Sequence, residues 1–278
     1  MRSPARWWPA GLVIAMLSRG TYTSAQSLAY IGSTQYAAGE YVFKRQVWSA
    51  YMSNGVAWSA ERIRISASIP LVIQDVGLVQ YSGAGMMVPT GGMANGEGTP
   101  QAAGMMSAGT MSGPNAQHIG IGDPVARIDA RLAGERGLLP AIWAIGSTKA
   151  PVADVAHGFG TGEWDVGGGL SLEKSLTRTS FVAEAVYWKL GNPPGGEFRN
   201  AVAYSLSGGQ LLGNGQLSVL GSVFGASSLW RGLAAPLQAA LGLGYRFPSG
   251  SGISGSVAAG LTRSTPDLAI AAAWRIPM

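Results

Sequence analysis

The sequence contains no cysteine and few charged residues. The absence of Cys excludes a disulfide scaffold, a cysteine-ligated zinc site and a thiol nucleophile. Charged residues make up 12% of the chain, about half of the roughly 25% found in an average protein. Glycine, in contrast, accounts for 42 of the 278 residues. These glycines follow no three-residue repeat, which excludes collagen, and the 47% hydrophobic content excludes a disordered chain. The composition therefore indicates an ordered protein in an unusual environment.

Residues 1–25 have the pattern of a secretory signal peptide. Arg2 and Arg6 precede an apolar stretch from Trp7 to Leu17 that is too short to cross a bilayer comfortably, and the small residues Thr23 to Ala25 offer a cleavage site. We expect export, with a short membrane anchor as the alternative. This segment holds three of the 19 basic residues and no acidic one, so the rest of the chain has 16 basic and 14 acidic residues. The resulting net charge of +2 argues against a nucleic-acid partner.

Beyond the signal peptide, no apolar run is long enough for a transmembrane helix, and helical periodicity is rare. Polar and apolar residues alternate instead, with Arg64 and Ser66 set between Ile63, Ile65 and Ala67. Such alternation predicts strands with one apolar and one polar face. The same pattern recurs in the segments 163–173, 237–247, 253–262 and 267–276.

Two features of these strands favour a transmembrane barrel over a soluble β-sandwich. Their polar faces consist of Gly, Ala and Ser beside charges of both signs, which suits a barrel lumen. Aromatic residues lie near strand ends, where aromatic girdles of outer-membrane barrels are found. These residues are Trp164, Tyr187, Tyr204, Tyr245 and Trp274.

The sequence predicts an all-β fold, an antiparallel transmembrane β-barrel of about 12 strands over residues 26–278. Ten strands is the alternative if the first two segments are not strands. The predicted strands are 27–34, 40–53, 56–73, 119–133, 138–149, 162–174, 179–190, 199–207, 215–225, 236–248, 251–262 and 267–277.

The connections between these strands alternate between short and long. We expect short periplasmic turns at Ser53–Gly55, 134–137, 175–178, 208–214 and 248–250, and Asn54-Gly55 is a type I′ hairpin signal. The other connections are mostly longer, and the segment 74–118 is the longest. Short turns on one side and long loops on the other are typical of an outer-membrane barrel.

If the apolar faces meet lipid, seven basic and seven acidic residues face the lumen. Balanced charges predict ion pairs between strands and argue against a strongly ion-selective pore. The alternative is that these charges only stabilise the barrel. The predicted lumen residues are Arg62, Arg64, Asp123, Arg127, Asp129, Arg131, Glu163, Asp165, Glu173, Glu184, Arg199, Arg246, Asp267 and Arg275.

The loop 74–118 holds six of the ten Met residues. Met provides an adaptable apolar surface, so one hypothesis is a lid that receives hydrophobic ligands. A second is Cu(I) binding by thioethers together with His118, and a third is a loop without a specific ligand. The Met residues concerned are Met86, Met87, Met93, Met105, Met106 and Met111.

The stretch 119–174 carries three motifs, a GxGD strand start at Gly120–Asp123, a Pro at 151, and a GTGxWDV strand from Gly160 to Val166. In these motifs the chain resembles the MetA-pathway phenol-degradation family of outer-membrane β-barrel, transporter-like proteins. The resemblance implies uptake of small compounds, including aromatic ones. The chain departs from the family pattern at Ala150-Pro151-Val152, and its last residue, Met278, is not aromatic.

Enzymatic activity is not expected. No GxSxG motif occurs, and the only histidines, His118 and His157, fall in or beside predicted loops. Two His without Cys also make a catalytic zinc site unsupported, and no cofactor is predicted. We expect a channel or transporter for small, aromatic or hydrophobic compounds in the outer membrane of a Gram-negative bacterium. Its expected partners are membrane lipid, the barrel-assembly machinery and the solute; a structural or adhesive barrel and a Met-rich copper-binding barrel are the alternatives.

Overall fold

The computed structural model describes residues 26–41, 46–74, 79–81, 87–89, 118–155, 159–192, 198–230 and 232–278. Within these residues the regular secondary structure consists of β-strands, and no helix is long and apolar enough to cross a membrane. The strands are β1 (Ser27–Gly39), β2 (Val47–Ser59), β3 (Ile63–Gln74), β4 (Val79–Tyr81), β5 (Met87–Pro89), β6 (His118–Ile121), β7 (Val125–Ala133), β8 (Ala141–Lys149), β9 (Asp165–Ser175), β10 (Thr179–Lys189), β11 (Ala201–Leu212), β12 (Leu217–Ala226), β13 (Leu237–Arg246), β14 (Gly252–Gly260) and β15 (Leu268–Pro277).

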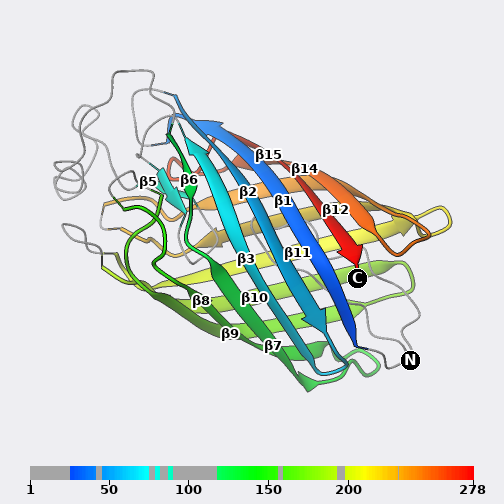
Figure 1. The fold of residues 1–278 in the computed structure, drawn as a ribbon. Coiled ribbons are helices and arrows are strands. Elements are labelled where there is room, and N and C mark those ends of the chain that lie inside the picture. The colour runs from blue at the N-terminus through cyan, green and yellow to red at the C-terminus, as the bar shows by residue number, and fades with distance from the viewer. Residues whose placement is uncertain are drawn as a thin grey trace.

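The main sheet closes on itself between its first and last strands (Figure 1). β1 pairs antiparallel with β15, with Ala29 opposite Pro277 and Ala38 opposite Leu268. β3 pairs with β6 near one end and with β7 near the other, so β6 and β7 together form one interrupted strand. The 13-stranded sheet is therefore a closed antiparallel barrel with 12 strand positions, which confirms the predicted fold class. β4 and β5 form a separate two-stranded sheet.

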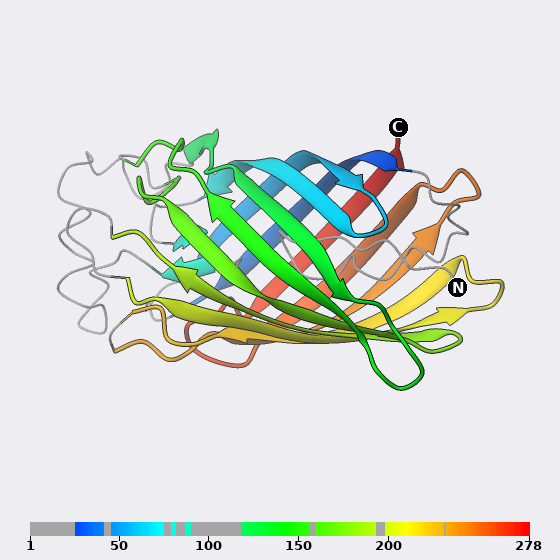
Figure 2. The ribbon, with the colours of Figure 1, turned by 90° about the horizontal axis from the view of Figure 1, so that it is seen from below.

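The two ends of the barrel differ in the length of their connections. The turns 60–62, 134–140, 176–178, 213–216 and 247–251 are short and lie at the end where β15 finishes (Figures 1 and 2). The opposite end carries the connections that include 75–117, 150–164, 190–200 and 227–236. We call these ends the turn end and the loop end. Their asymmetry agrees with the prediction.

The predicted hairpin at Asn54-Gly55 is wrong, because both residues lie inside β2 and pair with Ile69 and Ser68 of β3. The turn is formed by residues 60–62, where the Ala60 N–H donates to the Ile63 carbonyl at 2.8 Å. A type I′ turn needs a positive φ at its glycine, and Gly55 does not have one. A Cβ at Gly55 would lie 2.2 Å from the Ala67 carbonyl oxygen. Glycine is therefore required there by the close approach of β3.

Large apolar side chains cover the outer face of the barrel. Ile65 and Ile69 of β3, Leu170 of β9 and Leu241 of β13 are 45–72% exposed, and they alternate along each strand with inward residues. An outer face of this kind is suited to a lipid environment, and the strands of the main sheet find their backbone partners within the wall.

Exposed aromatic residues lie near strand ends on this outer face. Trp164, Tyr187, Tyr204 and Tyr245 are 37–58% exposed, in agreement with the predicted girdle. Trp274 is half-buried instead, because its ring packs over Gly32 of β1. A Cβ on Gly32 would lie only 2.3 Å from atoms of this ring. An aromatic ring over a strand glycine shields the backbone that the missing side chain leaves uncovered.

We predict that Gly55→Ala destabilises the barrel by about 1–3 kcal/mol, because the added methyl meets backbone atoms of β3 that no side-chain rotation can move. The matched control is Gly134→Ala in a turn, since a Cβ there has nothing within 4 Å. The measurement is the urea midpoint of the lipid-reconstituted protein, followed by tryptophan fluorescence. Equal midpoints for the two variants would contradict the assignment of Gly55 to a packed strand.

Candidate functional site

The charged residues expected in the lumen fall into three groups by burial. Arg131, Glu163 and Arg246 are half-buried. Arg62, Arg199 and Asp267 are exposed and lie in connections rather than on strands, so the expected interior position does not hold for these three. Eight of the predicted residues are buried, at 2–9% exposure. They are Arg64, Asp123, Arg127, Asp129, Asp165, Glu173, Glu184 and Arg275.

One buried ion pair joins two strands that are not neighbours. The Arg64 guanidinium on β3 donates to Glu173 on β9 through two parallel bonds, Nη1–Oε1 at 3.0 Å and Nη2–Oε2 at 3.3 Å. β7 and β8 lie between these strands in the wall, so the pair crosses the inner surface of both. The Arg64 Cζ stands 3.6 Å from the ring centroid of Trp143 on β8. This aromatic ring therefore supports the pair from the wall side.

A second buried pair crosses β8 and β9. Arg127 on β7 donates to both oxygens of Glu184 on β10, at 3.2 and 2.8 Å, and its Nε donates to Asp129 at 2.9 Å. Gly167, Gly169 and Ser171 are the inward residues of β9 opposite this stretch, and their small size leaves the space that the long side chains cross. We call Arg64–Glu173 and Arg127–Glu184 the two bridging pairs.

The bridging pairs are well suited to a buried position. Burying a charge is costly unless the ion is paired with good geometry and hydrogen-bonded. Both pairs use the planar guanidinium fork to hold both carboxylate oxygens, which is the strongest form of such a pair. All four side chains are 6–8% exposed. Removing one partner of either pair would therefore take away the closest opposite charge from the group that stays buried.

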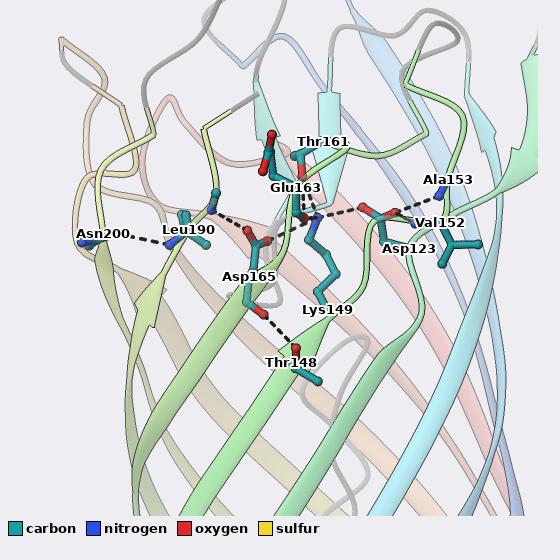
Figure 3. A network of polar contacts seen from close by, with 11 residues as sticks. Asp123, Thr148, Lys149, Val152, Ala153, Thr161, Glu163, Asp165, Leu190 and Asn200 are labelled. Carbon is teal, nitrogen blue, oxygen red and sulfur yellow. Dashed lines mark hydrogen bonds and ion pairs between the residues drawn. The ribbon is translucent and has the colours of Figure 1, made fainter. Parts of the chain in front are cut away.

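A second polar network lies at the loop end and is centred on Lys149, the last residue of β8 (Figure 3). The Lys149 side chain is 1% exposed; its Nζ lies 2.7 Å from Asp123 and 3.3 Å from Asp165, and it donates to the Thr161 hydroxyl at 2.7 Å. Asp123 also accepts the backbone N–H groups of residues 152 and 153. The network thus joins the break between β6 and β7 to the connection 150–164.

The Lys149 network brings together residues from the sequence motifs of 119–174. Asp123, Thr161 and Asp165 all contact one ammonium group, and a Cβ at Gly160 would lie 2.6 Å from Asp123. Asp165 further accepts the N–H of Gly191 at 3.0 Å, which ties in the connection 190–200. The motifs therefore hold the loop end of the wall together.

Sequence reasoning missed Lys149 and Trp143. The inward residues of β8 are Ala141, Trp143, Ile145, Ser147 and Lys149, all 0–9% exposed. Three of them are apolar, so the usual rule that the polar face points inward does not show which face of this strand is the inner one. One signal for Lys149 was present in the sequence. It lies two residues after the polar Ser147, and residues two apart in a strand share one face.

The opposite wall differs in character. The inward residues of β13, β14, β15 and β1 are mostly Gly, Ala and Ser, and several of them are only 5–8% exposed. At the turn end this wall carries two arginines, Arg246 and Arg275, which flank Gly252 in the register. The small inward residues are Gly242, Gly244, Ser254, Ser256, Ala240, Ala258, Ala269, Ala271, Ala273, Ser33 and Ala37.

Apolar side chains gather at the loop end of the interior. Phe198 and Trp230, from two different connections, make an edge-to-face contact at 5.1 Å within a cluster that includes Trp188 and Leu190. A second cluster contains Tyr51, Val72, Phe159 and Tyr41. Burial, with a smaller contribution from Asp267, raises the pKa of Tyr41 far above its ordinary value, so this phenol stays neutral.

The predicted Met lid cannot be placed. Met86, Met93, Met105, Met106 and Met111 lie outside the described residues, and only the backbone of Met87 is described, in β5. His157 also lies outside them, while His118 begins β6. Within the described residues no group of three or more His, Cys, Asp or Glu side chains could hold a metal ion. The lid and copper hypotheses stay predictions.

No protein-family model matches the chain, and the search of curated proteins finds no match. Membership of the phenol-degradation family therefore stays a prediction. Among solved structures, the chain is similar to an outer membrane channel from Pseudomonas putida F1, with a TM-score of 0.59 at 11% identity over 92% of this chain and 97% of that one. The Pseudomonas putida toluene transporter TodX matches at a TM-score of 0.40 and 10% identity, over 91% of this chain and 88% of that one.

The CymD monoaromatic hydrocarbon channel matches at a TM-score of 0.43 and 11% identity, over 91% of this chain and 88% of that chain. The likeness to the Pseudomonas putida F1 channel covers nearly the whole of both chains, which agrees with the closed barrel described above. The chain therefore has the fold of an outer-membrane β-barrel.

Proposed function

We propose that this protein is an outer-membrane channel for small solutes, including aromatic or hydrophobic compounds. The observation that carries the proposal is the contrast between the two inner walls. The charges of β3 and β7 to β10 pair with one another, whereas the inward residues of β13 to β15 and β1 are mostly small and mostly uncharged. Small side chains occupy little of the interior, which favours a narrow passage along this second wall.

The size of the barrel supports the same proposal. Eight-stranded barrels have interiors that side chains fill, and porins with 16 or more strands enclose wide aqueous channels. A barrel with 12 strand positions lies between them, and the low exposure of its inward residues favours solutes that are small. The apolar side chains at the loop end, such as Trp188 and Phe198, favour aromatic or hydrophobic solutes among them.

Export and membrane insertion belong to the proposal. Residues 1–25 act as the signal peptide, the barrel-assembly machinery inserts the chain, and the exposed apolar side chains of the outer face contact membrane lipid. The Arg-poor, Leu- and Ile-rich outer surface supports this placement, because a charge on the lipid face of a barrel is costly at the bilayer midplane.

One observation favours the alternative of a structural or adhesive barrel without transport. Ala240, Ser254, Ser256, Ala258 and Ala273 face inward and are only 5–8% exposed, which fits a closed interior as well as a narrow one. Permeation distinguishes the two functions.

We predict that liposomes containing the purified protein swell in isotonic solutions of small uncharged solutes, with phenol-like compounds and small sugars compared in parallel. Protein-free liposomes and liposomes with heat-denatured protein are the controls. Absence of swelling with every solute, from protein that resists SDS until it is boiled, would contradict the channel and favour the structural barrel.

We predict that Ser256→Trp slows solute entry several-fold, because this inward side chain of β14 pairs with Gly242 and Ala271 in the middle of the small-residue wall and a bulky ring there narrows the passage. The matched control is Val257→Trp, since Val257 is 51% exposed on the outer face. The rates are measured by swelling at equal amounts of SDS-resistant protein. Equal rates in the two variants would show that the passage does not run along this wall, or that the barrel has no passage.

A further inference from the structure

We infer that the two bridging pairs form the charge filter of this channel, so that it passes uncharged solutes and excludes ions. The inference rests on the proposed function, since it assigns the solute class of the same interior. Two features carry it, namely the fixed separation of charge across the inner wall and the near neutrality of the paired groups.

The bridging pairs separate positive from negative charge. Arg64 and Arg127 stand on β3 and β7, while Glu173 and Glu184 stand on β9 and β10. Every one of these residues belongs to a strand that is hydrogen-bonded on both sides. The pairs are therefore held in place by the barrel wall and not by loops, and ordinary loop motion does not open them.

Pairing also determines which protein groups an ion meets where it passes the bridging pairs. An ion that enters a narrow interior must exchange part of its water shell for protein groups. Here each guanidinium already faces a carboxylate at 2.8–3.3 Å, so no charge is available to replace that water without breaking a buried pair. An uncharged solute has a much smaller desolvation cost, and the pairs hinder it far less.

The test is the reversal potential of the reconstituted protein in a planar bilayer under a KCl gradient. Arg64→Gln removes the positive charge that faces Glu173 and should shift the selectivity toward K⁺. Glu173→Gln removes the negative charge that faces Arg64 and should shift it toward Cl⁻. Opposite shifts are expected only if both groups face the ion path, because a purely structural role would make both variants change in the same way.

The control variant is Glu135→Gln. Glu135 pairs with Lys174 at 2.9 Å, but it lies in the turn 134–140, and Lys174 points to the face of β9 opposite that of Glu173. This variant removes the same type of charge outside the interior and should leave the reversal potential unchanged. A shift equal to that of Glu173→Gln would overturn the inference, because surface charge would then explain both.

A double variant, Arg64→Gln with Glu173→Gln, decides the matter if a single variant fails to assemble, since it leaves neither charge unpaired. It should keep the reversal potential near that of the unmodified protein while total ion conductance rises, by about twofold or more. Unchanged conductance would overturn the charge filter. If the unmodified protein passes neither ions nor uncharged solutes, the proposed function fails; if it passes uncharged solutes and the variants conduct ions as it does, the filter alone fails.

Discussion

Backbone hydrogen bonding across the junction of β1 and β15 is the constraint on which the structure depends. In a hydrocarbon environment no water satisfies an unpaired N–H or carbonyl group, so a spanning sheet must close. The register from Ala29–Pro277 to Ala38–Leu268 provides that closure. Once the sheet is closed, each strand has one face outward and one toward the interior, and side-chain periodicity follows. The low overall charge agrees with an apolar outer face, and part of the Gly content agrees with close approaches between strands such as the one at Gly55.

The interior that results is divided by strand. Long charged side chains occupy β3 and β7 to β10, where they pair across intervening strands, and small residues occupy β13 to β15 and β1. The glycines and serine on the inner face of β9 leave space for the side chains of the bridging pairs. The Trp143 ring contacts the Arg64 guanidinium on its wall side. At the loop end the Lys149 network fixes the wall where β6 and β7 are interrupted. Proposed transport and proposed ion exclusion both follow from this division, since one wall would form the path and the other would set the filter.

Much of the fold could be predicted from the sequence, because alternation over segments such as 63–73 and 163–173 indicates directly which face points outward. Asn54-Gly55 misled the prediction, since local turn preference was outweighed by pairing with β3 along the whole of β2. Eight of the charges expected in the lumen are buried, yet their individual partners could not be predicted. Arg64 and Glu173 are 109 residues apart and meet only after closure brings β3 and β9 onto one inner surface. Lys149 was missed because apolar Trp143 and Ile145 share its face.

Whether a solute path runs through the barrel can be measured as water access to its interior, and the absence of cysteine removes background labelling. Single variants Ser256→Cys and Val257→Cys place a thiol on the inner and the outer face of adjacent positions in β14. We expect a small, membrane-impermeant thiol reagent to label the inward thiol in intact outer membranes and to spare the outward one. Labelling of the outward thiol alone, or of neither, in SDS-resistant protein would contradict a solute path through this barrel.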